Sequence, residues 1–245
     1  MQPLTLSSRF ENAAPPDAHC MGLVAAADED FRLSLNYAAP ADRARLAALF
    51  AFLIELRRIP SSVSEAALGE IRLQWHREAL AEIVAGKRPR AHPVVAALAA
   101  SVDVAAARPT LETMIDARAR LLYAPAFATL SDLRQFLAAA EAPLAVIALG
   151  DQGDAPGAAA LGLAEAHALA RLAPVFAPAL AAEAAAAALD LRAQHAPMLA
   201  GLSPEAFGRI AFLALTRGHA ARPDGAAWPV MKRLALVRAV ARGRF

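Results

Sequence analysis

Residues 40–60 read PADRARLAALFAFLIELRRIP, and this stretch decides the fold class. Apolar side chains recur along it at steps of three and four residues, which places them on one face of an α-helix: Leu46, Leu49, Phe50 and Leu53. Pro40 suits the first turn of a helix, and Pro60 ends one because proline lacks the N–H that a helix interior needs. The stretch therefore predicts a helix over about 40–59 with one buried face.

Several charged residues fall on or beside apolar helical faces. Arg57 continues the apolar stripe of the helix expected over 40–59, whereas Glu55 lies on the opposite side of that helix. In the next helical segment Arg72 falls within a broad apolar arc that includes Trp75, and Glu82 lies at the edge of that arc. Buried charges require partners or water. Two interpretations follow: Arg57, Arg72 and Glu82 satisfy one another inside a helical bundle, or they line a cavity.

The composition of the 245 residues excludes several classes of protein. Hydrophobic residues make up 58% of the chain and charged residues 20%, so enough apolar surface is present to exclude a disordered chain. A disulfide-stapled domain is excluded because Cys20 is the only cysteine. Alanine, the best helix former, supplies 68 residues, and no stretch shows the alternation typical of strands. We therefore predict an all-α protein.

Charge and hydropathy indicate where such a protein acts. The net charge is +2, and the arginines are spread along the chain between acidic residues, so we expect no nucleic-acid partner. Residues 1–16 lack the apolar core of a signal peptide, and no run of about 20 uncharged apolar residues occurs. A single cysteine fits a reducing compartment. We expect a cytoplasmic protein that at most lies on the inner membrane as a peripheral protein.

Proline and glycine divide the chain into about ten expected helices with short connections. Their ranges are 17–37, 40–59, 62–86, 93–106, 110–123, 131–149, 159–177, 180–200, 204–220 and 227–242. Ser62 with Glu65 has the spacing of a capping box, and Ser131 and Ser203 are expected N-caps. Pro143 is expected to kink the helix that contains it. We predict one helical domain over 17–245, preceded by a flexible N-terminal segment at 1–16.

No catalytic or metal-binding motif stands out. The chain has no G-x-G-x-x-G, P-loop, H-E-x-x-H or G-x-S-x-G pattern, and none of its six histidines pairs with another at three or four residues. We therefore expect no catalytic residue, no metal and no cofactor.

Segments along most of the chain nevertheless resemble one family. They comprise Phe50-Ala51-Phe52 with Glu55-Leu56, Val63-Ser64-Glu65, Gly69 to Trp75, Tyr37 to Arg43, Gly86 with His92-Pro93-Val94, Ile115 to Arg118, Phe127 with Asp132-Leu133, and Arg171 with Pro174. Over roughly 18–220 the chain is similar to the squalene/phytoene synthase family. The resemblance implies a single-domain, isoprenoid-synthase-like helical bundle around a deep central cavity.

Active members of that family couple two prenyl diphosphates with Mg²⁺ held by two aspartate-rich motifs. At the positions that match the first motif this chain has Arg57, Arg58 and Ser61, and at those of the second it has Ala168, Leu172 and Phe176. An arginine about 5 Å from a divalent ion, at an effective dielectric constant of about 20, opposes binding by roughly 7 kcal/mol. That is about five powers of ten in affinity. The resemblance therefore implies a member without metal-dependent prenyl transfer.

One non-catalytic branch resembles the chain more closely. It includes the phytoene-synthase-like mitochondrial assembly factor of respiratory complex I, and it is similar at Ala51-Phe52, at Glu55-Leu56 and over Ser62 to Glu65. We expect a catalytically inactive binding or assembly factor, with complex I subunits as partners. Seven candidate ligand-binding residues are expected to line the cavity: Arg57, Arg58, Arg72, Trp75, Glu82, Asp116 and Arg171.

Two alternatives stay open. The cavity could bind an isoprenoid or another lipid, with Arg57, Arg58 and Arg72 holding a phosphate, because arginine suits bidentate phosphate recognition. The chain could also be a prenyl-diphosphate transferase of the squalene/phytoene synthase type that uses displaced carboxylates such as Glu55, Glu65 or Asp116.

Overall fold

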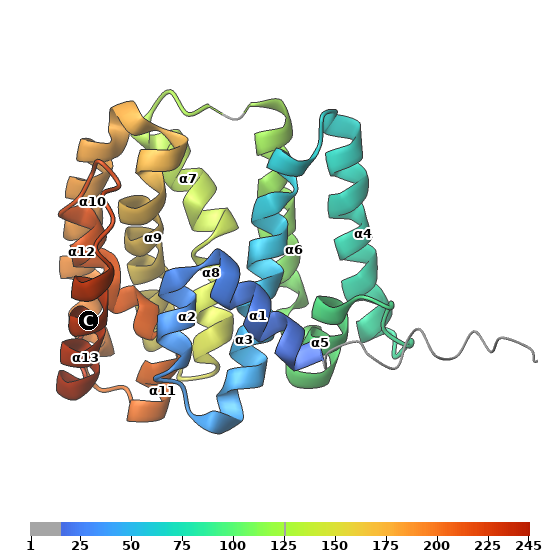
Figure 1. Ribbon diagram of the computed structural model, residues 1–245, viewed down its shortest axis with the longest axis horizontal. Coiled ribbons are helices and arrows are strands. Elements are labelled where there is room, and N and C mark those ends of the chain that lie inside the picture. Colours follow the sequence, from blue (N-terminus) through green and yellow to red (C-terminus); the bar gives the residue numbers. More distant parts are fainter. Residues whose placement is uncertain (1–15, 125) are drawn as a thin grey trace, which may run out of the picture.

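A computed structural model describes residues 16–124 and 126–245, and within these residues the chain is helical, with no strand (Figure 1). The predicted all-α single domain is confirmed. The segment expected at 1–16 lies outside the described residues except for Pro16, so that expectation stays a prediction.

The helices of the described part follow one another with short connections, as predicted. The α-helices are α1 (Pro16–Ala27), α2 (Glu29–Leu35), α3 (Pro40–Arg58), α4 (Ala66–Val84), α5 (Pro93–Ser101), α6 (Val104–Tyr123), α7 (Leu130–Ala140), α8 (Pro143–Leu149), α9 (Asp154–Phe176), α10 (Ala181–His195), α11 (Pro204–Arg209), α12 (Thr216–Ala220) and α13 (Pro229–Arg242). Short 3₁₀ turns join some of them: η2 (Pro60–Ser62), η3 (Pro178–Leu180), η4 (Ala196–Leu199) and η5 (Ala211–Leu215).

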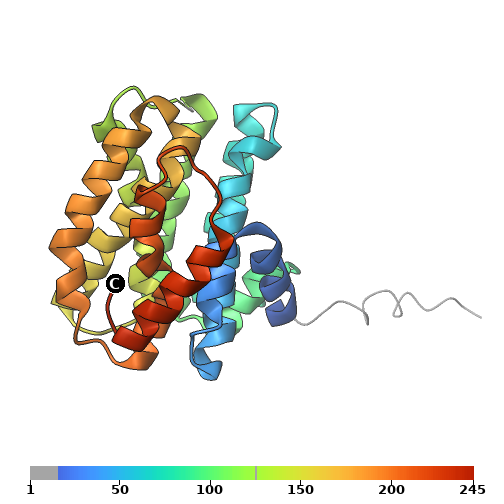
Figure 2. The same ribbon diagram turned by 60° about the vertical axis from the view of Figure 1, so that its left-hand side comes forward.

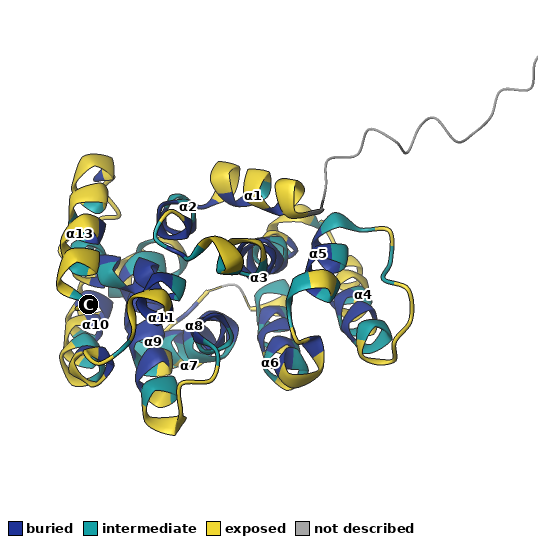
Figure 3. Cartoon of the chain, turned by 90° about the horizontal axis from the view of Figure 1, so that it is seen from below, coloured by how far each residue is buried: buried dark blue, intermediate teal, exposed yellow. Residues whose placement is uncertain are grey.

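Helix α3 lies in the interior of the bundle. It packs against α1, α5 and α8, and Figures 1 and 3 show α1 and α2 passing over one side of it. From Leu46 to Leu56 every residue except Glu55 is buried. Periodicity predicted one buried face for this helix, but the structure buries it on several sides.

Helix α9 is the second long helix of the interior, and it packs against α7, α8, α10 and α12. Its alanines let neighbouring helices approach closely, and a Cβ added at Gly162 would lie 2.4 Å from the His195 ring. By length and composition alone α9 could cross a membrane, but 56% of its most apolar window is buried inside the fold. That burial is typical of a core helix.

Three expected helices are each split into separate α-helices in the structure. The range 204–220 divides into α11 and α12, with η5 between them. The range 17–37 breaks at Asp28, whose carboxylate caps α2 by accepting from the Phe31 N–H at 3.0 Å. The range 131–149 breaks after Ala140, and Pro143 begins α8 instead of kinking a longer helix. Proline at the first helical position loses no helical hydrogen bond, so a new helix costs less than a kink.

Three N-terminal caps differ from the expected ones. The Ser62–Glu65 capping box is wrong, because α4 begins at Ala66 without a side-chain cap. Thr129, and not Ser131, caps α7 by accepting from the Asp132 N–H. Asp103 caps α6, which therefore begins before the expected residue 110 and contains Pro109. The cap at Ser203 is confirmed.

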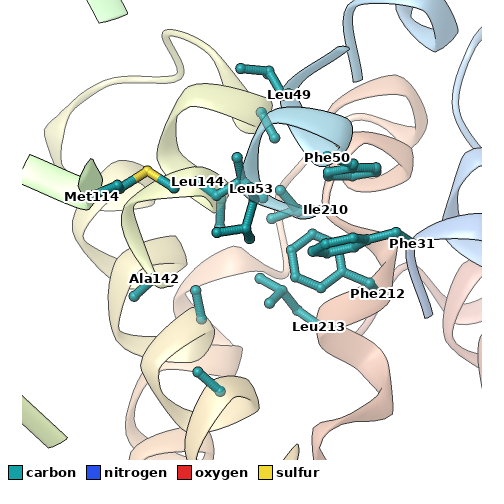
Figure 4. Close-up of a cluster of buried hydrophobic side chains, with 14 of the residues drawn as sticks. Phe31, Leu49, Phe50, Leu53, Met114, Ala142, Leu144, Ile210, Phe212 and Leu213 are labelled. Carbon is teal, nitrogen blue, oxygen red and sulfur yellow. The ribbon is translucent and has the colours of Figure 1, made fainter. Parts of the chain in front are cut away.

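An aromatic cluster fills the space between α2, α3 and η5. The Phe31 and Phe50 rings stack with centroids 4.2 Å apart, and Phe212 meets both rings edge-on (Figure 4). Leu53 and Ile210 lie in the same cluster and are also buried. This packing occupies the middle of the bundle.

Candidate functional site

Arg57 lies at the centre of the bundle and joins two carboxylates. From the last turn of α3 its Nη1 donates to Asp28 Oδ2 at 2.8 Å, and its Nη2 donates to Glu141 Oε2 at 2.6 Å. Arg118 of α6 is fully buried and donates to the other Glu141 oxygen and to the Ala140 carbonyl. Glu141 sits in the break between α7 and α8, so that break supplies the acid that two arginines share.

Arg171 of α9 extends this arrangement toward the C-terminal helix. Its Nη2 donates to Asp28 Oδ2 at 2.8 Å, and its Nε lies 3.4 Å from Asp30 Oδ2. On the other side of Asp30, Lys232 of α13 lies 2.8 Å from Oδ1 and 3.0 Å from Glu29. We call this set the central ion network: Asp28, Glu29, Asp30, Arg57, Arg118, Glu141, Arg171 and Lys232.

Formal charges in the central ion network cancel, with four acids and four bases. Burial by itself would raise the pKa of Glu141, but Arg118 and Arg57 outweigh burial and lower that pKa to about 2. Burial likewise opposes ionisation of Asp30, yet His219 and Arg171 hold its pKa well below the usual value. Both carboxylates are therefore ionised at neutral pH, and arginine contacts each of them. Removal of one partner from a buried pair of this kind strongly destabilises the folded protein, because the other charge stays buried without compensation.

Two histidines meet Asp30 within the same region. His219 Nε2 lies 2.7 Å from Asp30 Oδ2, His167 Nε2 lies 3.7 Å from it, and the three ligand atoms lie within 4.8 Å of one another. Zinc uses such ligands. Here, however, Lys232 and Arg171 contact the same carboxylate, and their positive charges oppose a divalent cation. We interpret the three residues as part of the buried ionic contacts.

The space beside Arg57 and Arg171, where the resemblance implies a deep central cavity, is narrow. The space beside Arg57 and Arg171 has a volume of about 20 Å³, and Phe31, Leu53 and Phe212 form part of its wall. Pockets that hold small molecules typically have volumes of about 300–1,000 Å³. Aromatic and aliphatic side chains therefore leave no ligand-sized space beside Arg57 and Arg171, and the wider expectation of a central cavity stays a prediction.

The residues at this centre do not fit the Mg²⁺ that the fold family implies. Arg57, with its pKa raised by Glu141 and Asp28 against the opposing effect of burial, remains a cation. The carboxylates nearest to it, Asp28 and Glu141, already accept hydrogen bonds from arginine. A hard dication needs several oxygen ligands free of such partners.

A separate groove lies on the surface beside α3 and α4, and we call it the α3–α4 groove. Its volume is about 430 Å³, and it is lined by Glu55, Arg58, Ile59, Ser62, Ile71, Arg72, Trp75, His76 and His92. Arg58 is exposed, and Arg72 donates to the Ser62 hydroxyl at 2.6 Å. Both guanidinium groups thus lie beside the apolar surface that Ile71 and Trp75 provide.

Polar groups with little exposure to solvent also line the α3–α4 groove. Burial raises the pKa of Glu55 to about 7, although Arg58 partly opposes the change, and Glu55 Oε2 has no hydrogen-bond partner among the described residues. His76 is 7% exposed, and neither of its ring nitrogens has a partner there. Burial and then His92 lower the pKa of His76 to about 4, so it is neutral at neutral pH.

The seven residues predicted from the sequence do not lie in one place. Arg57 and Arg171 meet in the central ion network, whereas Arg58, Arg72 and Trp75 line the α3–α4 groove. Glu82 and Asp116 line neither place.

Glu82 pairs with Arg90 at 2.8 Å, and Asp116, whose side chain is 63% exposed, pairs with Arg77 at 2.6 Å. The interpretation in which Arg57, Arg72 and Glu82 satisfy one another is therefore wrong, because each has other partners.

Sequence reasoning missed most members of the central ion network. Asp28, Asp30 and Glu141 carry no motif, and their partners lie far away along the chain: Arg57 is 29 residues from Asp28 and 84 from Glu141. One available signal was the acidic run Asp28-Glu29-Asp30 directly before Phe31, because acids that adjoin an apolar helix require partners when buried.

Comparisons with known proteins agree with this fold. The squalene synthase HpnC from Alicyclobacillus acidocaldarius has a TM-score of 0.68 at 14% identity, covering 84% of this chain and 92% of its own. A dehydrosqualene synthase solved with a ligand has a TM-score of 0.72 at 14% identity, covering 92% of this chain and 95% of its own. No curated protein matches the sequence. The family model "Squalene/phytoene synthase" matches residues 24–173, more than half of the chain, and the chain belongs to that family.

Proposed function

We propose that this chain is a non-catalytic member of the squalene/phytoene synthase family that acts as a binding or assembly factor for respiratory complex I. The observation that carries the first part is the placement of Arg57. Its guanidinium bridges Asp28 and Glu141 at the position where the resemblance requires metal-holding aspartates. Metal-dependent activation of a diphosphate needs the opposite charge there.

The narrow space beside Arg57 supports the same proposal. Coupling of two prenyl diphosphates requires room for both chains, and the space beside Arg57 has about 20 Å³. Exposing that space requires displacement of packed rings such as Phe31 and Phe212, together with separation of buried ion pairs. Both changes oppose a catalytic cycle that opens the centre at every turnover.

The part of the proposal that concerns complex I rests on the resemblance at Ala51-Phe52, Glu55-Leu56 and the segment from Ser62 to Glu65. These residues lie on α3 and on the connection to α4, next to the α3–α4 groove. We place the protein in the cytoplasm, with peripheral contact to the inner membrane where complex I is assembled.

An activity assay tests the loss of catalysis. Purified protein is incubated with farnesyl or geranylgeranyl diphosphate and Mg²⁺, in parallel with an active squalene synthase. We expect no coupled product and no release of diphosphate above a blank without protein. Clear product formation by the wild-type chain would overturn the first part of the proposal.

A deletion strain tests the assembly role. We expect less assembled complex I on native gels and lower NADH:quinone oxidoreductase activity, with restoration by the wild-type gene. The paired variant Arg58→Ala/Arg72→Ala tests the groove in the same strain, and Arg77→Ala serves as its control because Arg77 lies outside the groove and pairs with Asp116. Unchanged levels of complex I in the deletion strain would reject the assembly role.

A second candidate function is binding of an anionic lipid, for which the α3–α4 groove provides the specific observation. Arg58 and Arg72 offer guanidinium groups for a phosphate, and Ile71 and Trp75 offer apolar surface for a chain. Native mass spectrometry with farnesyl phosphate tests this function. Binding that is lost in Arg58→Ala/Arg72→Ala but kept in Arg77→Ala supports it, and no adduct with the wild-type chain rejects it.

A further inference from the structure

Helix α13 presents an apolar face to solvent. Val230 is 71% exposed, Val237 is 51% exposed and Leu234 is 48% exposed. At 100° per residue these three side chains lie within one narrow sector of the helix surface. The opposite side is attached to the protein body, where Leu236 is fully buried. Figure 2 shows α13 crossing the outside of the bundle, and Figure 3 shows most of it as exposed.

Arginines flank this apolar face on both sides. Arg233 lies on one edge, and Arg238 and Arg242 lie on the other, and all three are exposed. Within the described residues none of them forms an ion pair with a carboxylate, whereas arginines elsewhere, such as Arg57 and Arg209, do. The positive charge beside α13 is therefore available to an external anion.

A shallow hollow of about 570 Å³ beside α13 carries more of this charge. Six arginines and no acidic residue belong to its lining: Arg192, Arg217, Arg222, Arg238, Arg242 and Arg244. The chain as a whole has a net charge of only +2, so the excess of positive charge is local to this surface.

Several contacts hold α13 in a fixed orientation. Lys232 pairs with Glu29 and Asp30, and the Phe245 ring stacks on Phe207 with centroids 4.2 Å apart. Arg192 Nη2 donates to the Phe245 carbonyl at 2.7 Å. These contacts use the inner side of the helix and the end of the chain, so the outer apolar face is already formed before any partner binds.

We propose that α13 and the adjoining arginine-lined hollow form a docking surface for an anionic lipid bilayer. An interfacial helix combines an apolar face with flanking basic residues, because the apolar side chains enter the boundary of the acyl chains while the guanidinium groups meet phosphates. Val230, Leu234 and Val237 would enter the bilayer, flanked by Arg233 and Arg238. The inference specifies the peripheral membrane contact of the proposed function, but it depends neither on complex I nor on the loss of catalysis.

Charge distribution favours a bilayer over a protein partner. Basic residues border the apolar face along both of its long edges, a pattern that matches a continuous anionic surface. The hollow beside it adds arginines, and its lining holds no Asp or Glu side chain that would pair with basic groups of a partner protein. A protein that covers the same face is therefore an outcome of the test and not the proposal.

Vesicle co-sedimentation tests the proposal with the full chain. Wild-type protein is mixed with vesicles of phosphatidylcholine alone or of phosphatidylcholine with phosphatidylglycerol. We expect binding to the anionic vesicles only, with affinity that falls as salt rises. Equal binding to both vesicle types, or binding to neither, would overturn the proposal.

Matched variants locate the surface. Arg238→Glu/Arg242→Glu is expected to weaken binding by about tenfold or more, and Lys87→Glu/Arg88→Glu, with the same change of charge at exposed residues far from α13, is expected to bind like wild type. Leu234→Ser/Val237→Ser tests the apolar face and is expected to weaken binding even in low salt. Circular dichroism checks that each variant is folded.

Equal binding by the α13 variants and the control pair would overturn the assignment of this surface. Suppose that wild-type protein does not bind vesicles, and that the amide hydrogens of α13 are protected from exchange with solvent only in a complex with a purified complex I subunit. The face is then a protein interface, and the bilayer proposal is wrong. Restoration of complex I in the deletion strain is a separate measurement, so the two proposals can fail independently.

Discussion

At Arg57 one guanidinium satisfies carboxylates from two distant segments of the chain. Asp28 caps α2 and also accepts from Arg57, while Glu141 occupies the break between α7 and α8. The residue that opposes a metal ion therefore has a structural role of its own.

We predict that Arg57→Met destabilises the fold by about 3–5 kcal/mol, because the buried carboxylates of Asp28 and Glu141 would each lose an ion-pair partner. Urea unfolding followed by circular dichroism measures the change. Arg77→Met, which breaks a surface pair with Asp116, is the control and is expected to change stability by less than about 1 kcal/mol. Equal effects of the two substitutions would contradict the role assigned to Arg57.

Glu55 is the opposite case, a carboxyl group with little support for its charge. Its pKa is raised to about 7 from an ordinary value of 4.5. Below pH 4.5 the group is protonated in both the folded and the unfolded chain, so its ionisation does not affect the free energy of unfolding. As the pH rises toward 7, the unfolded chain releases the proton first, and the fold loses stability.

Glu55→Gln is therefore expected to stabilise the protein at pH 8 by up to about 3 kcal/mol and to leave its stability at pH 4 nearly unchanged. Unfolding curves at both pH values measure this difference. Glu65→Gln, at an exposed position, is the control and should show no comparable pH dependence. A gain of the same size at pH 4 would show that packing, and not the charge, causes the effect.

At the scale of the elements, close approaches between helices depend on small residues. Gly208 of α11 lies against the end of α2, where an added Cβ would be 2.4 Å from the Tyr37 carbonyl oxygen. That oxygen belongs to the backbone, so it cannot move aside as the tip of a flexible side chain can. The contact fixes how the C-terminal third of the chain meets the N-terminal helices.

Gly208→Ala is predicted to destabilise the protein by about 1–3 kcal/mol through this clash, even though alanine favours helices. Thermal unfolding gives the change as a lower Tm. The control is Gly201→Ala, because a Cβ there would meet no atom within 4 Å. A Tm for Gly208→Ala at or above that of the control would show that the two segments separate without cost.

At the scale of the whole molecule, aromatic side chains from several helices pack together in the interior of the bundle. Phe31, Phe50 and Phe212 meet there from α2, α3 and η5 (Figure 4). Arg57 of the central ion network lies beside them, with its guanidinium carbon 5.3 Å from the Phe31 ring centroid. Rings in this position therefore have to contribute to stability, as core residues do.

Phe212→Ala is expected to cost about 3–5 kcal/mol, because the ring is 4% exposed and its removal leaves a cavity among packed residues. Denaturant unfolding measures the cost. Val175→Ala, at a side chain that is 71% exposed, provides the control with little expected change. A small effect at Phe212 would indicate that the centre is loosely filled and can open.

The sequence by itself determined the helical class, the single domain, the central helix over 40–59 and the resemblance that the family match confirms. These features depend on local information, because helical periodicity and proline positions involve residues within a few places of one another. The cap at Ser203 was predictable for the same reason, whereas the breaks at Asp28 and Glu141 were not, because distant partners hold both residues.

Only the tertiary structure decided that Arg57 lies between Asp28 and Glu141, that Arg171 lies 143 residues from its partner Asp28, and that Arg58 and Arg72 line a surface groove instead. A helical wheel gives the side of a helix on which a charge lies, but not which distant segment meets it. The narrowness of the space beside Arg57 was equally hidden, because it depends on the summed volumes of side chains from several helices.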